Sequence, residues 1–225
     1  MATLRDGPTV AAPARIRKLR RGPLTRKQIL DAALQLFSEK GAARASVRDI
    51  AQAAGITDAA IYYHFPSKRE LFEAFIEERG FTAALHDLET AELPRTADRT
   101  LAISLDEAVR SIARGALDLM FANRGFMKVL FVEAMAEDPV AAEEYRTLVH
   151  RWEKAQVRIL KAYAAEGHLK ARDLDELAKQ LVITVIGAFV DSLMTTVDAA
   201  PEGEPPPELI RHVEVAMQHI VQGIT

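Results

Sequence analysis

The chain is predicted to be all-α, with a small helical unit near its N-terminus and a larger helical body after it. Two observations predict this class. Apolar residues recur at three- and four-residue intervals along most of the 225 residues, whereas the period-two alternation typical of strands is nearly absent. Hydrophobic residues make up 49% of the composition, which is enough for a buried core in one large or two modest domains.

Charge is divided unevenly along the chain, although the net charge is only −3. Residues 1–69 contain 13 Lys and Arg against 5 Asp and Glu, whereas residues 70–225 contain 16 against 27. A basic N-terminal part on an acidic remainder indicates a polyanionic partner at one end of the molecule. The alternative, that these charges only solvate the surface, explains so clean a division poorly.

Composition argues against several other classes of protein. Without cysteine, neither a disulfide framework nor a thiolate metal site is expected. No uninterrupted apolar run reaches the roughly 18 residues that a membrane span requires; the nearest, 182–190, contains Thr184 and Gly187. The basic N-terminus is not followed by an apolar segment, so it does not resemble a secretory signal. We therefore expect a cytoplasmic protein.

Residues 1–24 are interpreted as a basic flexible arm, because they are poor in large apolar residues and contain three prolines. Arg20 and Arg21 stand closest to the first predicted helix. Such arms lie along phosphates or enter a minor groove, as in homeodomains. A solvated tail is an equally good interpretation.

Residues 25–70 are predicted to form a compact three-helix domain, here called the head. Thr25 is expected to cap a first helix that runs to about Lys40, where Gly41 stops it. Ser46 is expected to cap the second helix, with Asp49 three positions later in a capping-box pattern. These local signals predict closely spaced helices.

The stretch from Ser46 to Phe65 has the proportions of a helix-turn-helix. Gly55 can adopt the positive φ that a sharp turn requires. Thr57 is expected to cap a third helix that ends near Phe65, before a proline. Two helices with this spacing are typical of DNA-binding domains.

The third predicted helix carries two tyrosines and a histidine on a short exposed face. Tyr62, Tyr63 and His64 offer donors for phosphate oxygens, while the small Ala59 lets the helix approach base edges. Lys68 adds a charge just beyond this helix. The alternative for Tyr62 is that it closes the core of the three helices.

The motifs of this region resemble the tetracycline-repressor (TetR) family of regulators. They are the IL–AA–LF helix, Gly41, DIA–AG and IYYHFPSKREL, over about 48 residues. The resemblance implies a DNA-binding head on an all-α body that binds a ligand and dimerises. One departure is Ala60, where the family often has glycine, which alters how closely the backbone can approach DNA. By position and composition, the candidate DNA-binding residues are Ser46, Thr57, Ala59, Tyr62, Tyr63, His64, Lys68, Arg20 and Arg21.

Residues 71–225, here called the body, are predicted to bind an effector and to dimerise. A fourth helix is expected to run from the head to about Glu92, as the only continuous mechanical link between the two parts. Pro94 marks a break after it. Further helices are predicted at about 105–122, 126–136, 139–165, 174–197 and 207–222.

Large and deformable side chains in the middle of the body suit a pocket for varied ligands. Each of them also suits an ordinary core, because the spacing of an apolar helix face is the same in both cases. Buried polar residues require partners and are better indicators of a site, although an internal hydrogen bond would satisfy them too. The candidate effector-binding residues are Phe121, Phe126, Met127, Phe131, Glu133, His150, Trp152 and Asp191.

The last two predicted helices have broad apolar faces that require cover on both sides. Two such helices from each of two chains would form a four-helix interface. Earlier helices of the same chain are the alternative cover, which would leave a monomer. His212 and His219 lie seven residues apart without another ligand pair, so we expect no metal, cofactor or catalytic site.

The sequence therefore predicts a dimeric transcriptional regulator, with a repressor favoured, released from a pseudo-palindromic operator by a small, largely apolar effector. A sequence of this kind does not distinguish repression from activation, because they depend on where the operator lies. The alternative is an all-α small-molecule-binding or metabolic protein that reuses a helix-turn-helix.

Overall fold

The computed structural model describes residues 22–90, 92–98, 100–169, 173–195 and 203–223. Within these ranges the chain is helical and contains no β-strand, which confirms the predicted fold class. Its described helices are α1 (Gly22–Lys40), α2 (Val47–Ala54), α3 (Asp58–His64), α4 (Lys68–Arg79), α5 (Thr82–Thr90), α6 (Leu105–Ala122), α7 (Arg124–Met135), α8 (Pro139–Ala165), α9 (Leu174–Thr195) and α10 (Pro207–Gln222).

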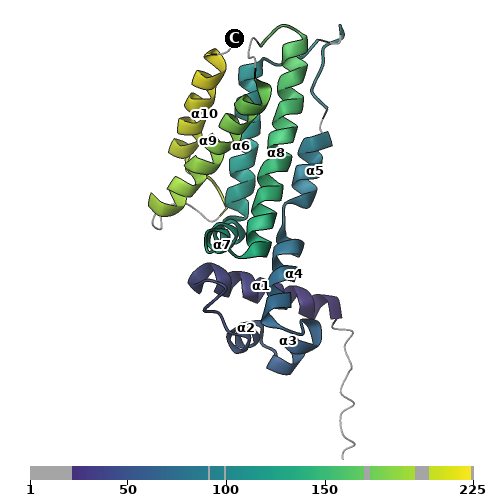
Figure 1. Cartoon of the computed structure of the whole chain (residues 1–225), viewed down its shortest axis with the longest axis vertical. Helices are drawn as coiled ribbons and strands as arrows, with labels where there is room; N and C mark the ends of the chain where they lie inside the picture. The colour runs from purple at the N-terminus through teal and green to yellow at the C-terminus, as the bar shows by residue number, and fades with distance from the viewer. Residues whose placement is uncertain (1–21, 91, 99, 170–172, 196–202, 224–225) are drawn as a thin grey trace, which may run out of the picture.

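Figure 1 shows an elongated molecule with α1, α2 and α3 at one end. Helix α4 leads from this end into the body, where α8 packs against α5 on one side and α9 on the other. Helices α6, α9 and α10 complete the body. Helix α7 lies across its base and packs against both α8 and α1. The head therefore contacts the body over more than one helix.

The caps predicted for α2 and α3 are present. The backbone N–H of Asp49 donates to Ser46 Oγ, and the N–H of Ser46 donates to Asp49 Oδ2, both at 3.1 Å. Gly55 has φ of 66°, and Thr57 Oγ1 accepts from the Ala60 N–H group at 3.2 Å. These hydrogen bonds satisfy free N–H groups at the starts of α2 and α3.

The predicted start of the first helix was wrong. Helix α1 begins at Gly22, so Thr25 lies inside it and is 9% exposed rather than capping it. Pro23 is compatible with the first turn of a helix, because a missing N–H group has no helical acceptor there.

The predicted continuous fourth helix was also wrong. Helix α4 ends at Arg79, Gly80 has an extended ψ of 159°, and α5 begins at Thr82. A Cβ atom on Gly80 would lie only 2.6 Å from Glu144 Oε1 of α8. The break brings Phe81 into the core and lays α5 along α8. Tertiary packing of this kind is not visible in helical periodicity.

A continuous series of aromatic contacts joins the head to the body. Phe37 of α1 contacts Phe75 of α4, with ring centroids 5.3 Å apart. Phe75 contacts Phe126 of α7, and Phe126 contacts Phe81, each at 5.6 Å. These four side chains belong to one hydrophobic core that spans both parts. Helix α4 is therefore not the only mechanical link between them.

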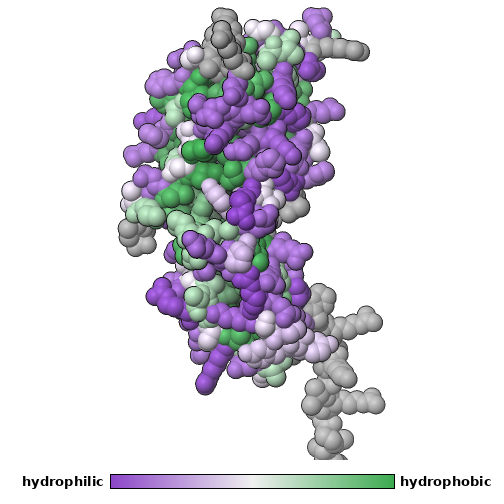
Figure 2. All heavy atoms as spheres, viewed as in Figure 1, coloured by the Kyte–Doolittle hydropathy of each residue, from purple (hydrophilic) through white to green (hydrophobic). Residues whose placement is uncertain are grey.

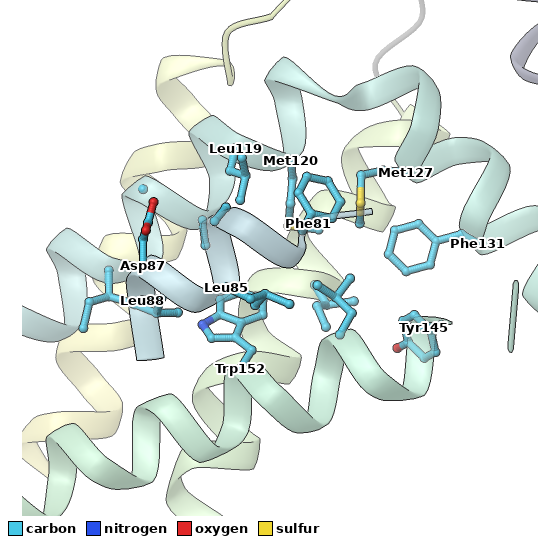
Figure 3. A pocket seen from close by; sticks show the side chains of 16 residues that line it. Phe81, Leu85, Asp87, Leu88, Leu119, Met120, Met127, Phe131, Tyr145 and Trp152 are labelled. Atoms are coloured by element: carbon cyan, nitrogen blue, oxygen red, sulfur yellow. The ribbon is translucent and has the colours of Figure 1, made fainter. Parts of the chain in front are cut away.

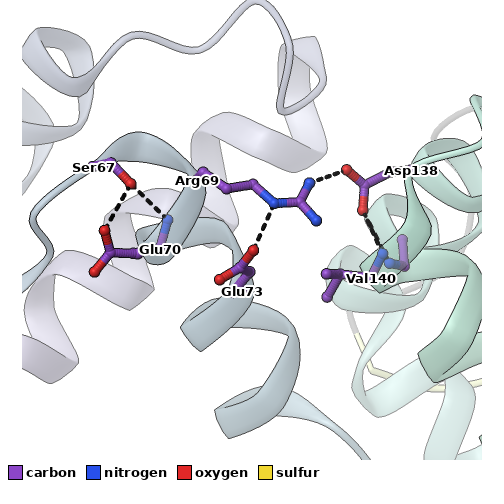
Figure 4. Close-up of polar contacts among 7 residues, drawn as sticks. Ser67, Arg69, Glu70, Glu73, Asp138 and Val140 are labelled. Atoms are coloured by element: carbon purple, nitrogen blue, oxygen red, sulfur yellow. Dashed lines mark hydrogen bonds and ion pairs between the residues drawn. The ribbon is translucent and has the colours of Figure 1, made fainter.

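Polar contacts reinforce the same junction. Glu133 Oε1 of α7 accepts the Ala42 N–H group of the head at 2.8 Å. Arg69 of α4 forms an ion pair with Asp138, which in turn caps α8 by accepting from the N–H groups of the first two residues after Pro139 (Figure 4). The start of α8 and the start of α4 are thus held together by one arginine.

Helix α9 is long and apolar enough to cross a membrane by length and composition alone. Counting uninterrupted apolar residues in the sequence did not identify α9 as such a helix, because α9 also contains polar ones. Core helices of soluble proteins meet the same criterion. In the structure α9 packs against α6, α8 and α10, while Ile183 and Met194 are 54% and 70% exposed. Figure 2 shows hydrophobic residues, in green, gathered on the body in this view.

Candidate nucleic-acid interface and internal cavity

Helix α3 presents two large side chains to solvent. Tyr62 is 51% and Tyr63 is 85% exposed, whereas Ile61 and Phe65 are buried in the core. Tyrosine is ordinarily a partly buried residue, so two exposed neighbours on a seven-residue helix require a reason other than packing. The alternative that Tyr62 closes the three-helix core does not agree with its exposure.

The remaining predicted residues of α2 and α3 are accessible. Ser46, Thr57 and Ala59 are exposed. The hydroxyl oxygens of Ser46 and Thr57 accept backbone N–H groups, but each hydroxyl retains a proton that can be donated to a phosphate. The small Ala59 leaves room for close approach to a base edge.

His64 and Lys68 are half-buried. The ring of His64 meets that of Tyr63 edge to face, at 5.3 Å between centroids. Lys68 Nζ donates to the Ala43 carbonyl oxygen at 2.9 Å, which ties the start of α4 to the loop before α2. Its charge lies close to the helix-turn-helix, although one of its three donors is occupied.

Two of the predicted residues, Arg20 and Arg21, lie outside the described residues. Another cation was missed by sequence reasoning: Arg48 is exposed in the first turn of α2, two residues after Ser46. Its place beside a cap residue of the helix-turn-helix was the available signal. Hydroxyl, ring and cationic donors are the side-chain groups that bind phosphate oxygens and base edges.

A cavity of about 480 Å³ lies within the body, which is an ordinary size for a small-molecule site. It is bounded mainly by α5, α6, α7 and α8 (Figure 3). Its lining residues are Phe81, Ala84, Leu85, Asp87, Leu88, Ile112, Gly115, Ala116, Leu119, Met120, Met127, Phe131, Tyr145, Leu148, Trp152 and Ile186.

The lining is almost entirely apolar. Its one charged residue is Asp87, which is exposed, and its other polar side-chain groups are the Tyr145 hydroxyl and the Trp152 indole N–H. Burial raises the pKa of Tyr145 above its ordinary value, and the nearby Glu153 carboxylate adds to this effect. The Tyr145 hydroxyl therefore stays protonated at neutral pH and remains a donor.

Three buried side-chain atoms lack a hydrogen-bond partner among the described residues: Asp106 Oδ1, Trp152 Nε1 and Gln156 Oε1. Of the three residues, Trp152 alone lines the cavity. Buried polar groups are nearly always paired, so this indole nitrogen is an unusual feature of the cavity wall.

The cavity contains three of the eight predicted effector-binding residues: Met127, Phe131 and Trp152. Phe121 instead packs edge to face on Phe189, at 5.2 Å between centroids. Phe126 lies in the aromatic series described above and separates the cavity residue Phe81 from the head.

The three polar candidates do not line the cavity. Glu133 bonds to the backbone of the head, as described above. His150 is exposed and borders a groove on the outside of α8, together with Lys154 and Arg158. Asp191 is exposed on α9.

Sequence reasoning missed the wall that α5 supplies, because it merged α5 with the preceding helix. It also missed Gly115 on α6. On α8, Tyr145, Leu148 and Trp152 follow the three- and four-residue spacing of one helix face, which was an available signal. Nothing in that spacing distinguishes a cavity wall from a packed core.

The head matches a known family. A match to the family described as "Bacterial regulatory proteins, tetR family" spans residues 29–75. Over 53 residues the chain is 51% identical to the HTH-type transcriptional regulator AcrR of Shigella flexneri. This matched segment covers 24% of this chain and 25% of AcrR. The chain thus spans about a quarter of the length of the first curated relatives that it matches.

Two further similarities extend over the body. The chain is 25% identical over 206 residues to the HTH-type transcriptional repressor BepR of Brucella suis biovar 1, covering 89% of this chain and 91% of that protein. The transcriptional regulator FadR from Bacillus subtilis, in complex with stearoyl-CoA, has a similar fold, with a TM-score of 0.64 and 18% identity over 88% of this chain and 99% of that one.

Proposed function

We propose that this chain, which belongs to the TetR family of bacterial regulatory proteins, is a dimeric cytoplasmic repressor that a small, largely apolar effector releases from a pseudo-palindromic operator. Residues 25–70 would bind DNA, residues 71–225 would bind the effector and dimerise, and residues 1–24 would form a basic arm. The name of the relative BepR supports repression over activation.

The observation that carries the DNA-binding role is the solvent-facing side of α3. Two exposed tyrosines lie on the second helix of a capped helix-turn-helix in the basic part of the chain. Exposed aromatic hydroxyls with nearby cations suit the phosphates and base edges of a major groove. An all-α binding protein that does not bind DNA would not explain two neighbouring exposed tyrosines at this position.

The effector role is supported by the apolar cavity and by its position. Phe81 lines the cavity and begins the aromatic series that leads through Phe126 and Phe75 to the head. The FadR protein of similar fold binds stearoyl-CoA, a ligand with a long apolar part. A ligand that moves Phe81 would therefore bias the position of the head.

An effector acts only through its preference for the state that does not bind DNA. Moving the population from 1:99 to 99:1 requires a preference of about 10⁴-fold. A cavity bounded by several helices suits this requirement better than a groove on one helix, because a ligand in it contacts those helices at once.

Selection from a pool of random duplex DNA tests the proposed function without knowledge of the operator. The full chain is expected to enrich an inverted repeat, with two half-sites that match the two heads of a dimer. The Tyr63→Ala variant, carried through the same selection, is expected to enrich this repeat much less strongly. Equal and sequence-independent recovery by both proteins would exclude a DNA-binding regulator.

A further inference from the structure

We infer that the cavity binds an uncharged, mostly apolar molecule whose hydrogen-bond acceptor pairs with the indole N–H of Trp152, and that this molecule enters between α5 and α6 beside Gly115. The inference rests on the proposed effector role of the cavity and names the chemistry of its ligand. Three features of the wall carry it: its charge, its unpaired donor and its glycine.

The charge of the lining selects against ions. No Lys, Arg or His is among the lining residues, and the single carboxylate, Asp87, is exposed. An ion that leaves water for an apolar site loses its hydration, and this loss is recovered only beside an opposite charge. A buried carboxylate or phosphate group of a ligand would find no such charge here. An ammonium group would find one only at Asp87, where it would remain in contact with water.

Trp152 supplies the one buried donor of the wall that has no partner among the described residues. Its side chain rises from α8 towards Leu85 and Leu88 of α5 (Figure 3). Neighbouring atoms cover the nitrogen, so an acceptor reaches it when a flexible neighbour shifts. A shift of Leu88, a half-buried residue of the same cavity wall, would give such access. A ligand carbonyl or ether would satisfy this donor, whereas a hydrocarbon would leave it unpaired.

Gly115 marks the entrance. It lies in the interior of α6, where glycine is less favourable for a helix than alanine. A Cβ atom there would meet nothing within 4 Å, so close packing is not the reason for a glycine. Gly115 is exposed and lines the cavity. A glycine here leaves room beside α6 for a molecule to enter from solvent, and we place the entrance at this position.

Ring-shaped probes of one size test the ligand chemistry on the full chain, without DNA. Cyclooctanone carries an acceptor, cyclooctane carries none, and cyclooctanecarboxylate and cyclooctylammonium carry charges. Affinities are compared through the rise in Tm at equal free concentrations. We expect cyclooctanone to bind best. Its preference over cyclooctane should fall about threefold to tenfold in Trp152→Phe.

The ratio of the two affinities cancels changes in cavity shape that the substitution causes. Tyr145→Phe, which removes the other donor of the wall, is the matched control and should leave the ratio unchanged. An unchanged ratio in Trp152→Phe overturns the inference, as does tighter binding of cyclooctanecarboxylate than of cyclooctanone. Failure of all four probes to raise the Tm of the wild-type chain overturns it as well.

The entrance has a separate test, because Trp152 is the only tryptophan of the chain and its emission reports on the cavity. In stopped-flow mixing with cyclooctanone, Gly115→Leu should slow association and dissociation together and leave the affinity nearly constant. Unchanged rates would exclude this entrance. Cyclooctanone could also bind through Trp152 without releasing the selected DNA. This outcome would contradict the proposed function but would still support the inferred ligand chemistry.

Discussion

Tyr63 offers the cleanest separation of DNA binding from folding, because its side chain is 85% exposed. We expect Tyr63→Ala to weaken operator binding by about 1–3 kcal/mol, the range for a good base contact. Its stability should change by less than about 0.5 kcal/mol, as for other exposed positions. Fluorescence anisotropy with labelled operator and thermal unfolding measure the two effects.

Phe65→Ala is the contrasting variant, since Phe65 is 2% exposed in the same head. It should lose about 3–5 kcal/mol of stability. If Tyr63→Ala were as unstable as Phe65→Ala, the tyrosine would be a structural residue and not a DNA contact.

Asp49 makes the stability of the head depend on acid pH. Hydrogen bonds from Lys40 and from the hydroxyl and N–H groups of Ser46 lower the pKa of Asp49 from 3.8 to about 2. The carboxylate therefore stabilises the fold fully above its unfolded pKa, and this contribution is lost as the pH falls through the folded pKa. In Asp49→Asn, Tm should be lower at neutral pH and should depend less on pH across that acidic interval.

Thermal unfolding by circular dichroism at a series of pH values measures this dependence. Asp58→Asn, which removes an exposed acidic residue from the first turn of α3, is the control. If the Tm of Asp49→Asn fell as steeply with acid as the Tm of the wild type, Asp49 would not be the source of the acid dependence.

Among the helices, the boundaries that depend on a local cap could be predicted and those that depend on distant contacts could not. Ser46 and Thr57 cap the helices that follow them, so their side-chain type is the signal. The end of α4 depends instead on Phe81 packing against Phe126 and on the closeness of Gly80 to Glu144. These partners lie more than forty residues away in the sequence.

The same distinction explains which cavity residues could be predicted. Met127, Phe131 and Trp152 belong to plainly apolar helix faces. Glu133 was expected at the effector because a buried carboxylate needs a partner, and its partner is in fact the Ala42 N–H group of the head. Polarity predicts that such a partner exists, but only the packing of α7 on α1 determines which one it is.

The ion pair between α4 and α8 should couple the head to the body measurably. Arg69 binds both Glu73 and Asp138, and hydrogen bonds to these carboxylates raise the pKa of Arg69 (Figure 4). Arg69 is 42% and Asp138 is 19% exposed at the side chain, so solvent weakens the pair. A double-mutant cycle with Arg69→Ala and Asp138→Asn should give a coupling of about 0.5–1 kcal/mol in urea unfolding.

Asparagine is chosen because it still caps α8, so the cycle isolates the charge. Glu73→Gln removes the charge of the other partner of Arg69, which lies within α4. It should leave the coupling free energy between Arg69 and Asp138 unchanged. Additive effects of the two substitutions in the cycle would show that this arginine does not join the two parts.

Across the whole molecule, the division of charge predicts a steep salt dependence. Residues 1–69 hold 13 Lys and Arg against 5 Asp and Glu. If two heads neutralise about 6–10 phosphates, operator affinity should fall about 10³–10⁵-fold between about 50 and 200 mM salt. Binding of the neutral cyclooctanone to the body should hardly change over the same range. An operator affinity independent of salt would contradict binding through phosphates.

The apolar side of α9 and α10 predicts the assembly that a two-headed regulator requires. Ile183 of α9 and Val215 of α10 are 54% and 45% exposed, although both are hydrophobic. In a dimer Ile183→Glu would bury two unpaired charges, which costs far more than the interface gains at that position. Light scattering should therefore change from twice the chain mass of 24.8 kDa to the mass of a single chain, and operator affinity should fall steeply because each half-site is then bound separately.

Val132→Glu is the control variant. It places the same charge on α7, where Val132 is 44% exposed, and should leave the dimer intact. A wild-type chain that is already monomeric at micromolar concentration, or equal dissociation of both variants, would remove α9 and α10 as the interface.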